Sequence, residues 1–120
     1  MDKEEMQRRT KEFALGIIRL TGSLPRGTTA TVIAGQLLRS GTSVGANYRA
    51  ACRAKSARDF ISKMGTVEEE ADECLYWMEL LAQSGTVRLE TLEPLMKEAD
   101  ELLAITVASI KTARRHSRRT

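Results

Sequence analysis

Hydrophobic residues recur at helical spacing in the first part of the chain. They lie three or four residues apart once Thr10 fills the single gap: Met6, Phe13, Ile17, Leu20 and Leu24. Glu4 and Glu5 suit the positive end of a helix dipole. Pro25 disfavours helical backbone at the residue before it. The pattern therefore predicts a helix over residues 4–23.

The next segment combines a hydrophobic side with a middle of small residues. The hydrophobic side consists of Val32, Ile33, Leu37, Val44 and Tyr48. Thr28 or Thr29 can cap a helix here, which we place at residues 28–53. Gly41 and Gly45 each cost a helix about 1 kcal/mol relative to alanine. We interpret these glycines as a sign that the helix packs closely against a neighbour.

A third segment has the spacing of a heptad seam. Its positions alternate steps of four and three: Phe60, Met64, Val67, Ala71, Cys74, Met78 and Leu81. Ser56 and Asp59 resemble a capping box, and Ser84-Gly85 ends the run. The pattern predicts a helix over residues 56–84.

The last hydrophobic stripe predicts a fourth helix over residues 91–113, with Pro94 in its first turn. The stripe consists of Leu92, Met96, Ala99, Leu103, Thr106 and Ile110. A basic tail, residues 114–120, follows. Because the connections are short, we expect one all-α domain over residues 1–120, an up-down-up-down antiparallel four-helix bundle.

Several hydrophobic residues lie outside these four stripes, namely Ile18, Leu75, Trp77, Leu95, Leu102 and Ile105. In so small a domain, large apolar side chains beyond the core are typical of a subunit interface. We therefore expect a homo-oligomer.

Charge is distributed unevenly along the chain. The net charge is +6 over residues 1–55, −8 over residues 56–110 and +5 over residues 111–120. Such a chain can form one basic and one acidic surface after folding. No apolar stretch reaches the ~20 residues of a membrane span and no signal peptide is recognisable, so we expect a cytoplasmic protein without a membrane partner.

The sequence offers little catalytic chemistry. His116 is the one histidine, and no Glu-x-x-His pair of a di-metal bundle is present. The acidic residues 68–73 are interpreted as a solvated face or as partners for arginines. Cys52 and Cys74 are expected to be thiols rather than a disulfide or metal site. We therefore expect no enzyme activity, no metal and no cofactor.

A row of small and polar residues follows the second predicted helix. It consists of Gln36, Ser40, Ser43, Asn47, Ala50 and Ala54. The row is either a solvent face or a contact between helices or subunits. A solvent face in so charged a protein should carry Lys and Glu, so we favour a contact that contains a hydrogen bond of Asn47. Trp77, which lies outside the third stripe, is also expected to pack between helices or subunits.

Basic residues form two groups that could contact phosphates. Arg39, Arg49, Arg53, Lys55 and Arg58 follow the second helix and its corner. The second group is Lys111, Arg114, Arg115, Arg118 and Arg119. Each group has an alternative interpretation: Arg49, Arg53 and Arg58 pair with the acidic third helix, and the tail is disordered, solubilising charge.

Residues 36–78 resemble a known bacterial family. The R-S-x-x-S-x-x-A-N pattern is formed by Arg39, Ser40, Ser43, Ala46 and Asn47, and Asp59-Phe60 and Cys74-Leu-Tyr-Trp-Met78 follow it. This combination is similar to the four-helix bundle proteins encoded within intervening sequences of 23S ribosomal RNA genes, once described as S23 ribosomal proteins. The accessory variability determinants of diversity-generating retroelements are similar to that family.

The resemblance covers residues 13–110 and implies a homopentamer. For the retroelement relatives it also implies a basic surface that binds nucleic acid and a reverse transcriptase. We therefore expect a non-catalytic oligomeric adaptor that binds structured RNA or DNA, or a nucleic-acid enzyme such as a reverse transcriptase. The alternative is a protein-binding scaffold without nucleic-acid binding.

Overall fold

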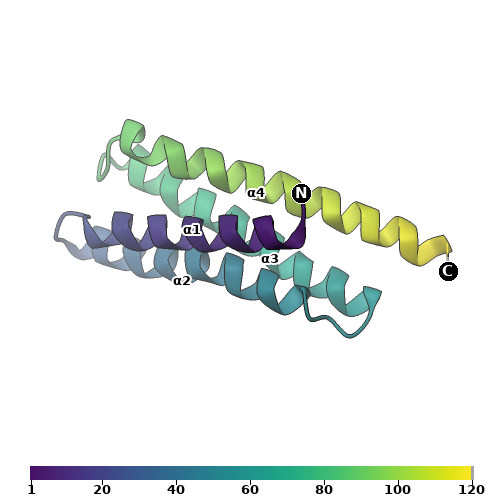
Figure 1. Ribbon diagram of the computed structural model, residues 1–120. Helices are drawn as coiled ribbons and strands as arrows, with labels where there is room; N and C mark the ends of the chain where they lie inside the picture. The colour runs from purple at the N-terminus through teal and green to yellow at the C-terminus, as the bar shows by residue number, and fades with distance from the viewer. Residues whose placement is uncertain (120) are drawn as a thin grey trace.

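Four helices make up most of the chain. The computed structural model describes residues 1–119, and the side chains of residues 1–118. The helices are α1 (Lys3–Gly22), α2 (Thr28–Ala51), α3 (Ala57–Gln83) and α4 (Leu89–Arg119). No strand occurs in this part of the chain. Figure 1 shows the helices alternating in direction, which confirms the predicted all-α, up-down-up-down four-helix bundle.

Side chains define the starts of two helices. Asp2 caps α1 by accepting a hydrogen bond from the Glu5 N–H at 2.8 Å. Ser56 caps α3 by accepting from the Asp59 N–H at 3.0 Å, as the sequence predicts. The start of α2 differs from the prediction: Gly27 is its N-cap and no threonine side chain caps it. Gly27 has φ 143°, a conformation that residues with a Cβ rarely adopt.

Helix α4 is longer than the sequence analysis predicts. It begins at Leu89 and continues to Arg119, whereas the expected helix covered residues 91–113 and a tail followed. No glycine or proline follows Pro94, and arginine is a good helix former. Cations in the last turns also interact favourably with the helix dipole. The residues assigned to a tail therefore extend α4 beyond the other helices (Figure 1).

The core consists of one stripe from each helix. The predicted stripes of α1 and α3 are buried from Met6 to Leu20 and from Met64 to Leu81, and only their ends, Leu24 and Phe60, are half-buried. On α4, Leu102 is buried and Leu103 is not, the reverse of the prediction.

Val32, assigned to the apolar side of α2, is instead 58% exposed. Val32 and Ile33 are adjacent, so only one of them can face the core, and Ile33 continues the line of Leu37 and Val44.

Close contact between α1 and α2 explains the two glycines within α2. A Cβ at Gly41 would lie 2.8 Å from two carbons of Ile17. A Cβ at Gly45 would lie 3.2 Å from Thr10 Oγ1. Both glycines therefore let the backbone of α2 approach α1, which confirms the close packing expected at these positions.

Candidate nucleic-acid interface

Four of the predicted phosphate-binding residues lie around the corner between α2 and α3. Arg49 is in the last turn of α2, Arg53 and Lys55 are in the connection, and Arg58 is in the first turn of α3. All four are exposed. None makes an ion pair within the described chain; the carboxylate of nearby Asp59 binds Lys63 Nζ at 2.6 Å.

Four more predicted residues lie on the last turns of α4. Lys111, Arg114, Arg115 and Arg118 are exposed, and none is ion-paired among the residues described. The side chain of Arg119 lies outside the described residues. Figure 1 shows that the α2–α3 corner and the C-terminal part of α4 lie at the same end of the bundle. We call these eight cations, Arg49, Arg53, Lys55, Arg58, Lys111, Arg114, Arg115 and Arg118, the basic end.

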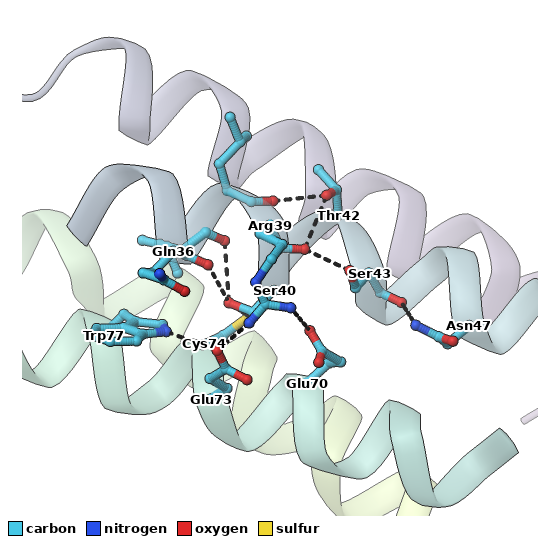
Figure 2. Close-up of polar contacts among 12 residues, drawn as sticks. Gln36, Arg39, Ser40, Thr42, Ser43, Asn47, Glu70, Glu73, Cys74 and Trp77 are labelled. Carbon is cyan, nitrogen blue, oxygen red and sulfur yellow. Dashed lines mark hydrogen bonds and ion pairs between the residues drawn. The ribbon is translucent and has the colours of Figure 1, made fainter. Parts of the chain in front are cut away.

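Arg39 is separate from the basic end. It lies in the middle of α2, and its guanidinium binds the carboxylates of Glu70, at 3.3 Å, and Glu73 (Figure 2). The hydrogen bond to Glu73 and the charges of both glutamates raise the pKa of Arg39. The acidic third helix thus serves as a partner for an arginine, but for Arg39 rather than for the basic end.

The row of small residues on α2 divides into a buried member and exposed or half-buried members. Ser40 is buried; its hydroxyl donates to the Gln36 carbonyl at 3.0 Å and accepts from the Cys74 thiol at 3.5 Å. Gln36 itself is exposed, and Ser43 donates to the Arg39 carbonyl at 2.7 Å. Ser40 therefore provides the expected contact with a neighbouring helix.

Asn47 does not make the hydrogen bond that was expected across a contact. Its Nδ2 donates to the Ser43 carbonyl at 2.9 Å, which lies one turn back on the same helix (Figure 2). An amide side chain on a half-buried helix surface finds this carbonyl without a partner helix.

Trp77 is half-buried beside the acidic residues of α3. Its Nε1–H donates to Glu73 at 3.2 Å, and its ring meets Tyr76 edge-on with centroids 5.1 Å apart. Tyr76 is 53% exposed. Trp77 therefore supports the carboxylate that binds Arg39.

The thiols and acidic residues show no arrangement of a reactive centre. Cys52 and Cys74 are free thiols, as expected. Burial raises the pKa of Cys74 to about 12, which keeps it protonated at neutral pH. No three His, Cys, Asp or Glu residues of the described chain converge as a metal site would require. Nor does any described helix have the length and apolar character needed to cross a membrane.

Sequence reasoning did not identify an apolar cleft at the basic end. The cleft, about 670 Å³, lies between the starts of α1 and α3 and the last turns of α4. It is lined by Met1, Met6, Tyr48, Ala57, Phe60, Met64, Ile105, Ala108, Ser109, Thr112, Ala113 and His116. The sequence analysis underestimated the length of α4, and most of the α4 lining of the cleft lies past the start of α1.

The fold and the surface define a small four-helix bundle with one strongly basic end. Comparison with known proteins places it more narrowly: the chain belongs to the 23S rRNA-intervening sequence protein family, whose model matches residues 2–108. This confirms the family resemblance seen in the sequence.

A solved structure from Bacteroides thetaiotaomicron supports the same assignment. That protein, of unknown function and from the S23 ribosomal protein family, shares 35% sequence identity with this chain and superposes with a TM-score of 0.86. The similarity covers 92% of this chain and 99% of the other. No curated protein matches the chain.

Proposed function

We propose that this protein is a non-catalytic nucleic-acid-binding module that contacts phosphates through the basic end. One observation carries the proposal: eight exposed cations from two segments far apart in the sequence lie at one end, and none is ion-paired within the described chain. Cations that converge without carboxylate partners attract a polyanion. They need not break an ion pair within the protein before they bind a phosphate.

The form of this surface favours shape and charge over base sequence. No Phe, Tyr or Trp side chain is exposed among the eight cations, and the one exposed ring there, that of His116, is a small platform for stacking a base. The helical cations of α4 instead project at fixed intervals from a rigid rod, which suits the phosphates of a folded RNA or a duplex. The name of the family, which refers to an intervening sequence of 23S rRNA, favours RNA as the first ligand to test.

Salt dependence of binding tests this proposal. The protein is titrated against a fluorescent RNA hairpin at several salt concentrations from ~50 mM upward, and log K is plotted against log[salt]. The double variant Arg114→Gln/Arg118→Gln should reduce the slope by roughly 0.7–0.9 for each phosphate that the variant no longer neutralises. Glutamine preserves helix propensity, so circular dichroism should be unchanged.

A matched control removes the same charge from the opposite end of the bundle. Arg19 and Arg26 are exposed and without ion pairs among the described side chains, and they lie near the α1–α2 connection. Arg19→Gln/Arg26→Gln should leave the slope unchanged. Equal effects of both double variants, or no binding by the intact protein at ~50 mM salt, would contradict the proposal.

A second candidate function rests on exposed apolar side chains. Leu15 and Ile18 on α1 are each 46% exposed, and Leu38 on neighbouring α2 is 39% exposed. We propose that this face, Leu15, Ile18 and Leu38, mediates self-association. An oligomer would repeat the basic end around the assembly, so a scaffold and a nucleic-acid adaptor are compatible. A partner such as a reverse transcriptase, which the family resemblance implies for the retroelement relatives, would then bind the assembled form.

A further inference from the structure

Helix α4 extends well past the start of the helix packed beside it. Arg9 Nε of α1 binds Glu98 of α4 at 3.0 Å, and α1 begins six residues before Arg9, at Lys3. Because the two helices are antiparallel and rise equally per residue, Lys3 lies level with about residue 104 of α4. Beyond this level, α4 continues past the start of α1 (Figure 1).

The face of α4 that meets α1 continues into this part of the helix. Arg9 binds Glu98 and Glu101 on that face. The same face continues at steps of three or four through Ile105, Ala108, Thr112 and His116, and all four line the apolar cleft. The cleft therefore occupies the position that α1 would fill if it extended further in its N-terminal direction.

The shape of the cleft suits a helix. Tyr48 of α2 and Phe60 and Met64 of α3 form an apolar floor. Along α4 most of the lining side chains are small, namely Ala108, Ser109, Thr112 and Ala113, and the larger Ile105 and His116 lie towards the two ends. Small side chains permit the short distances at which helices pack.

Cations adjoin residues that line this cleft, since Arg49 follows Tyr48 and Arg115 precedes His116. Arg49 lines the groove between α1 and α2 beside the first turns of α1, and Arg53 lies one turn further along. Arg115 adjoins His116 on the α4 side, and none of these arginines is paired with a carboxylate among the described residues. Helix α1 itself enters this end with Asp2, Glu4 and Glu5 in its cap and first turn. A partner helix that continues the line of α1 would place acidic side chains beside these arginines if it carried glutamates on both of its flanks.

We propose that the cleft binds an acidic amphipathic helix of a partner protein, about three turns long and aligned end to end with α1. The apolar floor favours a protein over a nucleic acid, since its aromatic rings, Tyr48 and Phe60, are buried or half-buried among apolar side chains. Arg114 and Arg118 lie on the opposite side of α4 at roughly 100° per residue, so a phosphate ligand and the helix can bind together. The proposal shares Arg49, Arg53 and Arg115 with the basic end, but it does not require phosphate binding at Arg114 and Arg118.

Synthetic peptides test the proposal directly. The probe is a fluorescein-labelled peptide of about 12 residues, with leucines at steps of three and four and glutamates on both flanks. Its partner peptide is identical except for lysines in place of the glutamates. We expect saturable binding of the glutamate peptide to the full chain by fluorescence anisotropy, and binding of the lysine peptide at least about tenfold weaker.

Protein variants locate the binding. Thr112→Trp fills the cleft from an exposed position and should weaken binding of the glutamate peptide at least about tenfold. Ala104→Trp, exposed on α4 but outside the cleft lining, should leave binding unchanged. Arg49→Glu/Arg53→Glu should reverse the preference in favour of the lysine peptide.

Three outcomes would overturn the proposal. One is the absence of saturable binding of either peptide. A second is a change of sedimentation coefficient on Thr112→Trp, which would assign the cleft to a second copy of the chain. The third is displacement of the peptide by an RNA hairpin whose own affinity falls on Thr112→Trp, which would assign the cleft to nucleic acid.

Discussion

Close packing at single residues determines how α1 and α2 meet. Gly41 is buried against Ile17, whose branched carbons occupy the space that a Cβ would need. The atoms concerned lie next to the Ile17 backbone, so they cannot turn aside as the tip of a long side chain could. Gly35, on the same helix, has no atom within 4 Å of the position of its missing Cβ. Gly41 and Gly35 thus lie on the same helix, but only Gly41 lacks room for a Cβ.

Alanine substitution at these glycines should have opposite effects. Gly41→Ala should lower the free energy of unfolding by about 1–3 kcal/mol, because the added methyl overpacks the contact with Ile17. Gly35→Ala should raise it by up to about 1 kcal/mol, because alanine favours helix and nothing obstructs the methyl. Urea unfolding followed by circular dichroism measures both. Equal effects of the two substitutions would show that α1 and α2 do not meet at Gly41.

At the scale of elements, the start of α3 combines a cap with an ion pair. Ser56 accepts from the Asp59 N–H, while the Asp59 carboxylate accepts from the Lys55 N–H at 3.0 Å and from Lys63 Nζ. The hydrogen bond from Lys63 and that from the Lys55 backbone lower the pKa of Asp59 below its ordinary 3.8. The ionised form is therefore the one that the folded protein favours.

Acid should remove the contribution of Asp59. Because folding lowers the pKa of Asp59, its stabilisation is present above the unfolded-state value of 3.8 and is lost as the pH falls through the lower folded-state pKa. Asp59→Asn should lower the urea midpoint at pH 7, and its difference from the parent protein should disappear towards pH 2. Glu69→Gln, at an exposed residue of α3 with no ion pair in the described chain, should show no such pH-dependent difference. A difference that persists in acid would show that the carboxylate charge is not what stabilises the helix.

Most of the helix pattern follows from sequence spacing, and the exceptions have physical causes. Leu102 and Leu103 both fit a step of three or four from Ala99 and Thr106, so spacing cannot choose between them. The packing of α4 against its neighbours determines that Leu102 is the buried residue. Likewise, the basic composition of residues 114–120 suggests a tail, but arginine is a good helix former and its side chain is exposed on a helix as well as in a tail.

At the scale of the molecule, the candidate site depends on topology that no local pattern contains. The sequence identifies both groups of basic residues, and up-down-up-down connectivity brings the α2–α3 corner and the end of α4 to one end of the bundle. The sequence offers arginine partners as one interpretation of the acidic residues 68–73, but it does not single out Arg39 as the arginine that binds Glu70 and Glu73. The apolar cleft was missed for a similar reason, since it arises from the unequal lengths of α1 and α4.

Self-association concerns the whole molecule, because the proposed interface uses side chains from two helices. Leu15, Ile18 and Leu38 remain exposed in the single chain, and burying them against other copies would remove apolar surface from water. The parent protein should therefore sediment as an oligomer of the 13.3 kDa chain, and a pentamer is the number that the family resemblance implies. Leu15→Glu/Ile18→Glu should yield a 13.3 kDa monomer with unchanged helicity, because neither side chain belongs to the core. Leu89→Glu, at a residue 48% exposed at the start of α4, should leave the assembly intact. Sedimentation equilibrium at micromolar concentration decides the matter: a monomeric parent protein would refute self-association, and a dimer or tetramer would refute only the number five.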